Sequence, residues 1–149
     1  MPEVRHVREE LWDEHTKEFR LRSLPTVPDV ELPILRDDLS VSPGGSTVIG
    51  SVTVPPGTVL RVTYLKYLTS DPRGALFSIA QNGSAVDYPY LPSAGETIVK
   101  EGVDNPVYVL EGTVEVYLNA VFGAVSPGTV YGLVLHGYYS RQEELGGVT

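Results

Sequence analysis

From about residue 46 to the C-terminus, short stretches of alternating apolar and polar residues are separated by turn-forming residues. Residues 48–54 carry this alternation, and residues 60–64 and 114–120 repeat it. Successive side chains of a β-strand point to opposite faces, so a period of two is typical of a strand covered on one face. We therefore predict strands at these three segments.

Strong turn signals divide this region further. Phe77, Ser78 and Ile79 lead into Asn82-Gly83, which is the dipeptide most typical of a two-residue β-hairpin turn. Another strand is expected over residues 107–110. The remaining turns are Pro55-Pro56-Gly57, Asp71-Pro72-Arg73-Gly74, Pro92-Ser93-Ala94-Gly95, Asp104-Asn105-Pro106 and Ser126-Pro127-Gly128. About seven or eight antiparallel strands at this spacing predict a mainly β fold, an antiparallel β-sandwich or jelly roll.

The first 22 residues follow a different pattern, in which apolar residues recur at the i, i+3, i+4 spacing of one helix face. Asp13 with Lys17 and Glu18 with Arg22 are oppositely charged i, i+4 pairs. We predict an amphipathic helix over residues 3–22, with Val4, Val7, Leu11, Trp12, His15 and Phe19 on its apolar face. Such a helix needs a surface to lie on, either its own β domain or a partner.

Prolines punctuate the segment that follows, at positions 25, 28, 33 and 43. Proline is excluded from helix interiors and from central strands, so we expect an extended linker here. The sequence thus predicts an N-terminal arm over residues 1–45 and a β-sandwich body over residues 46–149. The arm residues expected to form an interface are Val4, Val7, Leu11, Trp12, Phe19, Leu24, Val27, Val30, Leu32 and Ile34.

The last predicted strand, residues 130–139, is apolar or aromatic on both faces. The second face of a strand in a single sandwich has nothing to cover it, so either the arm or another subunit should do so. We expect Tyr131, Leu133, Leu135 and Tyr139 to contribute to this interface. The alternative is an ordinary hydrophobic central strand with tyrosines at its solvated rim.

Composition limits the classes of partner. The chain has 149 residues, enough for one domain, and its formal net charge of −8 argues against a nucleic-acid partner. There is no cysteine, no apolar run of membrane-spanning length and no typical signal peptide, so we expect a protein made in the cytosol. A single Met, three Asn, two Gln and proline-rich loops are typical of thermostable proteins.

No catalytic or cofactor-binding pattern is evident. His6, His15 and His136 do not have the spacing of metal ligands, and no nucleophile and base form a recognisable motif. The loop acids Asp71, Asp87, Glu101 and Asp104 follow no calcium-binding consensus. We therefore expect no enzymatic activity, no cofactor and no metal. Tyr88 and Tyr90, which flank Pro89, could instead stack on a sugar or contact a subunit.

With its arm, its proline-rich linker and its acidic β body, the chain resembles the auxiliary decoration or cement proteins of tailed bacteriophage capsids, those of phages infecting thermophilic bacteria in particular. The matching segments are residues 4–22 and 24–39. The resemblance implies a homotrimer on the outer capsid surface, assembled in the host cytoplasm and bound to the major capsid protein. Its arms would cross to neighbouring subunits and stabilise the virion. The alternative function is a carbohydrate- or receptor-binding β module.

Overall fold

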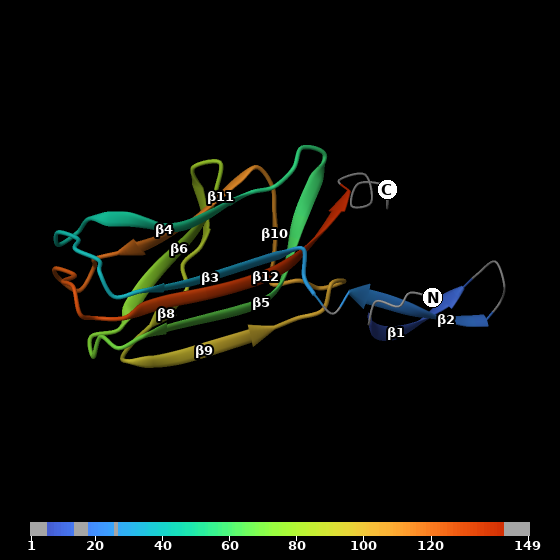
Figure 1. The fold of residues 1–149 in the computed structure, drawn as a ribbon, viewed down its shortest axis with the longest axis horizontal. Helices are drawn as coiled ribbons and strands as arrows, with labels where there is room; N and C mark the ends of the chain where they lie inside the picture. The colour runs from blue at the N-terminus through green and yellow to red at the C-terminus, as the bar shows by residue number, and fades with distance from the viewer. Residues whose placement is uncertain (1–5, 14–17, 26, 142–149) are drawn as a thin grey trace.

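The chain folds mainly into antiparallel β-strands, as the computed structural model of residues 6–13, 18–25 and 27–141 shows (Figure 1). Two five-stranded sheets make up the main body. The first, here called the β12 sheet, contains β3 (Val30–Arg36), β5 (Thr58–Thr69), β9 (Gly95–Lys100), β10 (Tyr108–Leu110) and β12 (Tyr131–Arg141). The second, the β11 sheet, contains β4 (Ser46–Thr53), β6 (Ala75–Gln81), β7 (Ser84–Asp87), β8 (Tyr90–Leu91) and β11 (Thr113–Asn119).

Strand pairing in the two sheets is nested. β3 pairs with β12, β4 with β11, β5 with both β9 and β10, and β6 with both β7 and β8. The chain from β3 to β6 therefore pairs, in reverse order, with the chain from β7 to β12. Two further pairings, β5 with β12 and β6 with β11, join these nested pairs into the two sheets.

A single hydrophobic core lies between the sheets. Alternate residues point into it in several strands, as in β11, where Val114, Val116 and Leu118 are buried while Glu115 and Tyr117 face outward. β12 contributes Leu133 and Leu135 from the opposite sheet to the same cluster. The alternation predicted from the sequence therefore sets which face of each strand is buried, and the predicted mainly β sandwich is confirmed.

The predicted hairpin at Asn82-Gly83 connects β6 to β7. Both residues have positive φ angles, 49° and 87°, which is the conformation that a type I′ turn requires. Asn82 also accepts a hydrogen bond of 3.0 Å from the backbone N–H of Thr113 through its Oδ1 atom. The turn is thereby attached to the start of β11.

The sandwich begins at Val30 rather than at residue 46, which corrects the predicted boundary of the arm. β3 lies at the edge of the β12 sheet, where Val30 and Ile34 are buried in the core. Pro33 is tolerated because an edge strand has one side free of ladder hydrogen bonds. The proline rule correctly excluded a central strand, but an edge strand satisfies it as well as a linker does.

Residues 6–13 and 18–25 form strands, so the prediction of a helix over residues 3–22 is corrected. β1 (His6–Asp13) and β2 (Glu18–Pro25) pair as an antiparallel hairpin, in a two-stranded sheet separate from the sandwich. In the sequence, Phe19 and Leu21 alternate with Arg20 and Arg22, and this period of two favours a strand over a helix. Figure 1 shows this hairpin beyond one end of the sandwich.

Two truncations test the corrected boundary. Deleting residues 1–26 should leave a cooperatively folding domain, because β3 and its buried side chains remain. Deleting residues 1–45 should abolish cooperative folding, because it removes β3 and exposes the part of the core beneath it. Urea unfolding followed by circular dichroism distinguishes the two, and a sharp transition in the shorter fragment would contradict the placement of β3.

Candidate functional site

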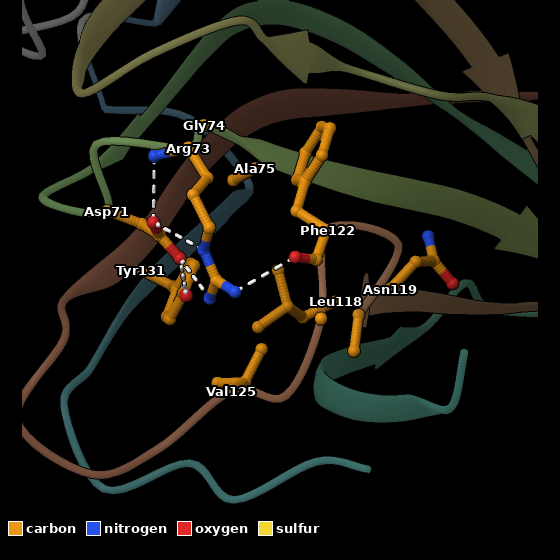
Figure 2. Close-up of a pocket in the computed structure, with 11 residues that line it drawn as sticks. Asp71, Arg73, Gly74, Ala75, Leu118, Asn119, Phe122, Val125 and Tyr131 are labelled. Atoms are coloured by element: carbon orange, nitrogen blue, oxygen red, sulfur yellow. Dashed lines mark hydrogen bonds and ion pairs between the residues drawn. The ribbon is translucent and has the colours of Figure 1, made fainter. Parts of the chain in front are cut away.

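A polar cluster with a buried carboxylate and an exposed arginine lies at the end of the sandwich where β5 turns into β6. Asp71 is 4% exposed, and its carboxylate accepts hydrogen bonds from the guanidinium of Arg73 at 2.9 and 3.1 Å (Figure 2). The hydroxyl of Tyr131, at the start of β12, donates to the same carboxylate at 2.7 Å. We call these three residues the Asp71 cluster.

Local sequence builds this cluster. Within the turn Asp71-Pro72-Arg73-Gly74, the N–H of Arg73 donates to Asp71 Oδ1 at 2.9 Å, and that of Gly74 donates to the Asp71 carbonyl at 2.9 Å. Gly74 has a φ of 98°, and a Cβ at this position would lie 2.0 Å from the Leu91 carbonyl oxygen. Only glycine fits this turn without displacing the neighbouring strand.

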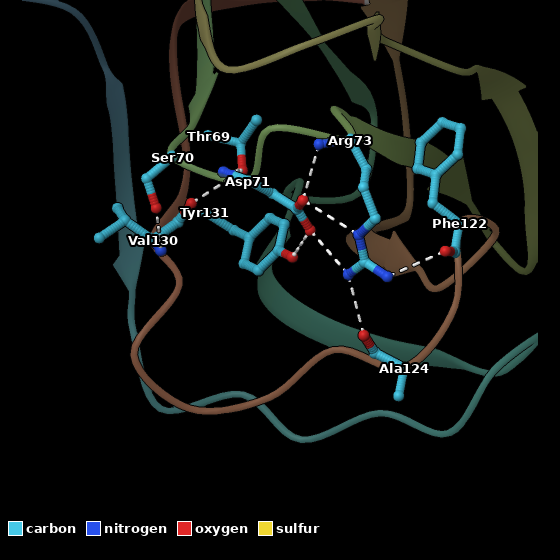
Figure 3. Close-up of polar contacts among 8 residues, drawn as sticks. All are labelled: Thr69, Ser70, Asp71, Arg73, Phe122, Ala124, Val130 and Tyr131. Carbon is cyan, nitrogen blue, oxygen red and sulfur yellow. Dashed lines mark hydrogen bonds and ion pairs between the residues drawn. The ribbon is translucent and has the colours of Figure 1, made fainter.

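The Asp71 cluster also holds a distant loop. Arg73 donates to the carbonyl oxygens of Phe122 and Ala124, both at 2.9 Å, in the connection between β11 and β12 (Figure 3). Close by, the hydroxyl of Thr69 donates to the Val130 carbonyl at 2.9 Å. The contacts join the β5–β6 turn to the β11–β12 connection and close this end of the sandwich.

Electrostatics stabilise the ionised form of Asp71. Hydrogen bonding from Arg73 lowers the pKa of Asp71 from 3.8 to about 2, and the Tyr131 hydroxyl adds to the effect although burial opposes it. Burial, followed by the hydrogen bond to Asp71, raises the pKa of Tyr131 to about 12. Over the neutral range the cluster is therefore an ion pair with a neutral phenol, which fits a structural role.

The cavity beside the cluster is too small for a substrate. Its volume of about 10 Å³ has room for about one water molecule. The charged groups that line it, Asp71 and Arg73, are already paired with each other and with the backbone. Within the described residues, no group of three or more His, Asp or Glu side chains could hold a metal ion.

The predicted body interface residues lie mainly inside the sandwich. Tyr131, Leu133 and Leu135 are buried in the core, and the half-buried Tyr139 packs against it. This corrects the expectation that they contact a partner, because burial within one chain leaves the first three almost no surface to offer. The sequence indicated correctly that β12 is apolar on both faces, but the residues chosen were those of the inner face.

The residues of the predicted arm interface lie in different environments. Val30 and Ile34 are core residues, Leu32 packs partly against the core, and Val27 is 68% exposed. Val4 lies outside the described residues, as do the side chains of Val7, Leu11, Trp12, Phe19 and Leu24. Among the arm residues whose side chains are described, Val27 is therefore the one that could contact a partner extensively.

Tyr88 and Tyr90 are both exposed, as a binding role would require. Tyr90 lies beside Phe122, with the ring centroids 6.0 Å apart, so the two form an aromatic pair near the outer face of the β11 sheet. The sequence analysis did not select Phe122, because it lies 32 positions from Tyr90 and follows no motif. Of the loop acids, Asp87 accepts a hydrogen bond from the Tyr108 hydroxyl at 2.5 Å.

The predicted interface residues did not include those on the outer face of β12. Val134 and His136 are half-buried there, and His136 stacks on Tyr64 of β5 with a centroid distance of 4.9 Å. No described segment covers this face as a third layer. It is the second face of β12 for which the sequence predicted a covering element.

No protein-family model matches the sequence, and no curated protein matches it either. Among the described residues, no helix is long and apolar enough to cross a membrane. The inference of function therefore rests on the fold and the surfaces described above.

Replacing Asp71 by Asn tests the role of the Asp71 cluster. The folded-state pKa of Asp71 is below its usual value, so its stabilisation is complete above about pH 4 and is lost as the pH falls toward 2. Asp71→Asn should lower the free energy of unfolding at pH 7 by on the order of 2 kcal/mol. The difference from the native chain should shrink below pH 4.

Asp38→Asn is the matched control, because Asp38 pairs with Arg36 at the same separation of two residues but on the surface. It should have little effect on stability. Urea unfolding at several pH values measures both variants. Equal losses, or a loss in Asp71→Asn that does not depend on pH, would contradict this account.

Proposed function

We propose that this protein is a non-enzymatic structural component of a virion, which binds the outer surface of a bacteriophage capsid and stabilises it. It acts as a homo-oligomer, a trimer in the arrangement that the resemblance implies, and its partner is the major capsid protein. The β-sandwich is the body on the capsid surface. The N-terminal hairpin is the element that contacts a neighbouring subunit.

The separate β1–β2 hairpin is the observation that carries this proposal. It pairs with no described strand of the sandwich. A lone two-stranded hairpin is at best marginally stable in water, so it needs another surface to become ordered. A neighbouring subunit supplies that surface in an assembly, and many such contacts together give strong attachment through avidity.

The strand order supports a more specific description of the sandwich, a jelly roll. When β7 with β8 and β9 with β10 are each counted as one interrupted strand, eight strands remain, and each pairs with its counterpart from the other end of the chain. Such a folded-over hairpin of two four-stranded sheets is the jelly-roll arrangement, which is common among viral capsid proteins. The same fold occurs in lectins, so it does not decide the function alone.

The net charge of the chain fits this role. A net charge of −8 repels the capsid's DNA and keeps free copies apart, so attachment must come from specific contacts. The Asp71 cluster closes one end of the sandwich, and Figure 1 shows the hairpin at the other end. The conformational entropy lost on assembly is then that of ordering the hairpin, since the body is held by its own contacts.

Comparing the full chain with residues 27–149 tests the proposed role of the hairpin. Light scattering should give a mass several times 16.2 kDa for the full chain, and a smaller assembly for the fragment. Trp12 is the only tryptophan and lies in β1, so its emission should shift to the blue as the full chain assembles on concentration. A monomeric full chain, or identical assemblies with and without the hairpin, would contradict the proposal.

A carbohydrate-binding role is the second candidate, and the exposed pair of Tyr90 and Phe122 favours it. Aromatic rings at a protein surface can stack on the apolar face of a sugar. If this candidate is right, Tyr90→Ala and Phe122→Ala should each weaken binding to a glycan found by array screening by about tenfold. Val109→Ala, an exposed apolar change on the other sheet, should not. Absence of any bound glycan would eliminate this candidate.

A further inference from the structure

Four side chains form a row across the outer face of the β12 sheet. The strand register places Glu31 of β3 beside His136 of β12, His136 beside Tyr64 of β5, and Tyr64 beside Lys100 of β9. His136 and Tyr64 stack in the middle of the row, and Lys100 lies over the Tyr64 ring at 5.9 Å from its centroid. The row therefore runs from a carboxylate through two rings to an ammonium.

The two charged ends of the row are too far apart to pair within one chain. Three strand spacings of about 4.8 Å separate β3 from β9, or roughly 14 Å. Glu31 and Lys100 are both exposed, and among the described residues Glu31 has no ion-pair partner. Each end is thus available to a group of opposite charge on another molecule.

The neighbouring row is largely apolar. Pro33, Val134, Lys66 and Ile98 follow one another across the same four strands, and Pro33 and Ile98 at its ends are exposed. Lys66 is already engaged by Glu96 at 3.7 Å. In the next row Leu35 is 70% exposed. Exposed apolar residues in adjacent rows are typical of a surface that another protein covers.

Two leucine side chains cover Gly132 in that next row. Gly132 of β12 stands between Leu35 of β3 and Leu68 of β5 in the register. A Cβ at Gly132 would lie 3.1 Å from atoms of both leucine side chains, so the two leucines already fill the space above the glycine. This part of the row is therefore a continuous apolar surface.

We propose that the outer face of the β12 sheet binds the same face of a second copy of this chain, across a two-fold axis that runs along the strands between β12 and β5. This rotation reverses each row onto itself. Glu31 of one copy then meets Lys100 of the other, twice per interface, and His136 meets Tyr64. In the neighbouring row Pro33 meets Ile98, which makes an apolar contact at each end of that row.

The order of charges in the row favours a second copy over other occupants. A row that runs from negative to positive is complementary to itself when reversed, which is the condition for an isologous two-fold contact. Two sheets related in this way can pack in the aligned manner of β-sandwiches. Because the chain carries a net charge of −8, two copies need such local pairing to approach each other.

The size of the face is sufficient for a stable contact. The five strands of the β12 sheet contain 7, 12, 6, 3 and 11 residues, which at about 3.3 Å per residue and about 4.8 Å per strand corresponds to a face of roughly 600 Å². Standard protein interfaces bury about 800 Å² of accessible surface on each partner. The accessible surface of the face is larger than its flat area, because side chains project from the sheet. The face is therefore large enough for a dimeric contact.

This inference rests on the proposed homo-oligomeric function but uses a different surface from the hairpin. The hairpin would join subunits through the arm, whereas the two-fold contact joins bodies. Removing one should leave the other intact, so the two contacts can be tested separately in the full chain.

Charge reversal in the full chain tests the two-fold contact. Glu31→Lys places two Lys pairs across the interface and Lys100→Glu places two Glu pairs, so each variant alone should dissociate to half the native mass. The dissociation constant should rise by at least about tenfold. When the two variants are mixed, each position 31 faces an opposite charge at position 100, and the native mass should return.

Glu115→Lys is the matched control, since it makes the same charge change on the outer face of the β11 sheet. It should keep the native mass, and circular dichroism should show that all three variants are folded. Native masses for both single variants would overturn the proposal, as would a mixture that stays dissociated, because then the two positions would not meet. Deletion of residues 1–26 tests the hairpin independently and should not alter the effect of mixing.

Discussion

β12 pairs with β3 on one side and with β5 on the other, and this double pairing holds the whole β12 sheet together. Its inner face supplies Leu133 and Leu135 to the core, and its first residue, Tyr131, bonds to Asp71. Among the described strands β3 has no other partner, so it stays in the sheet only while β12 does. The core, the closed end and the proposed contact face therefore all depend on this one strand.

The two ends of the sandwich differ in how they are held. At one end, hydrogen bonds and an ion pair join the β5–β6 turn to the β11–β12 connection. The other end continues into the β1–β2 hairpin (Figure 1). A body that is closed by its own contacts at one end, and linked to a separate element at the other, suits a subunit that attaches to neighbours without changing its own fold.

The sequence predicted the strands whose two faces differ most. Alternation located β4, β5 and β11, because one face of each is buried and the other is not. β9 was missed, since it is an edge strand with much of both faces exposed and so carries little contrast. Several apolar positions of the N-terminal segment match the spacing of a helix face. In β2, however, apolar residues also alternate with charged ones, and the segment forms a strand that pairs with β1.

The candidate surfaces were harder to predict than the strands. The apolar character of β12 was evident, but the inner and outer residues could be assigned only once the register was known, because a shift of one residue exchanges the faces. The sequence places Asp71 only in a turn, since nothing in the sequence brings Tyr131 to Asp71. Glu31 and Lys100 lie on strands that were not predicted, so their shared row had no sequence signal.

The nested pairing also has a consequence for how the chain is made. β3 must pair with β12, which lies roughly one hundred residues further along. During synthesis, β3 emerges long before β12 exists, and its apolar side chains have no sheet to join in the meantime. Long-range pairs of this kind also form slowly, because a large loop must close first. The newly made chain therefore passes through a period in which Val30 and Ile34 are uncovered, and completion of the last strand ends it.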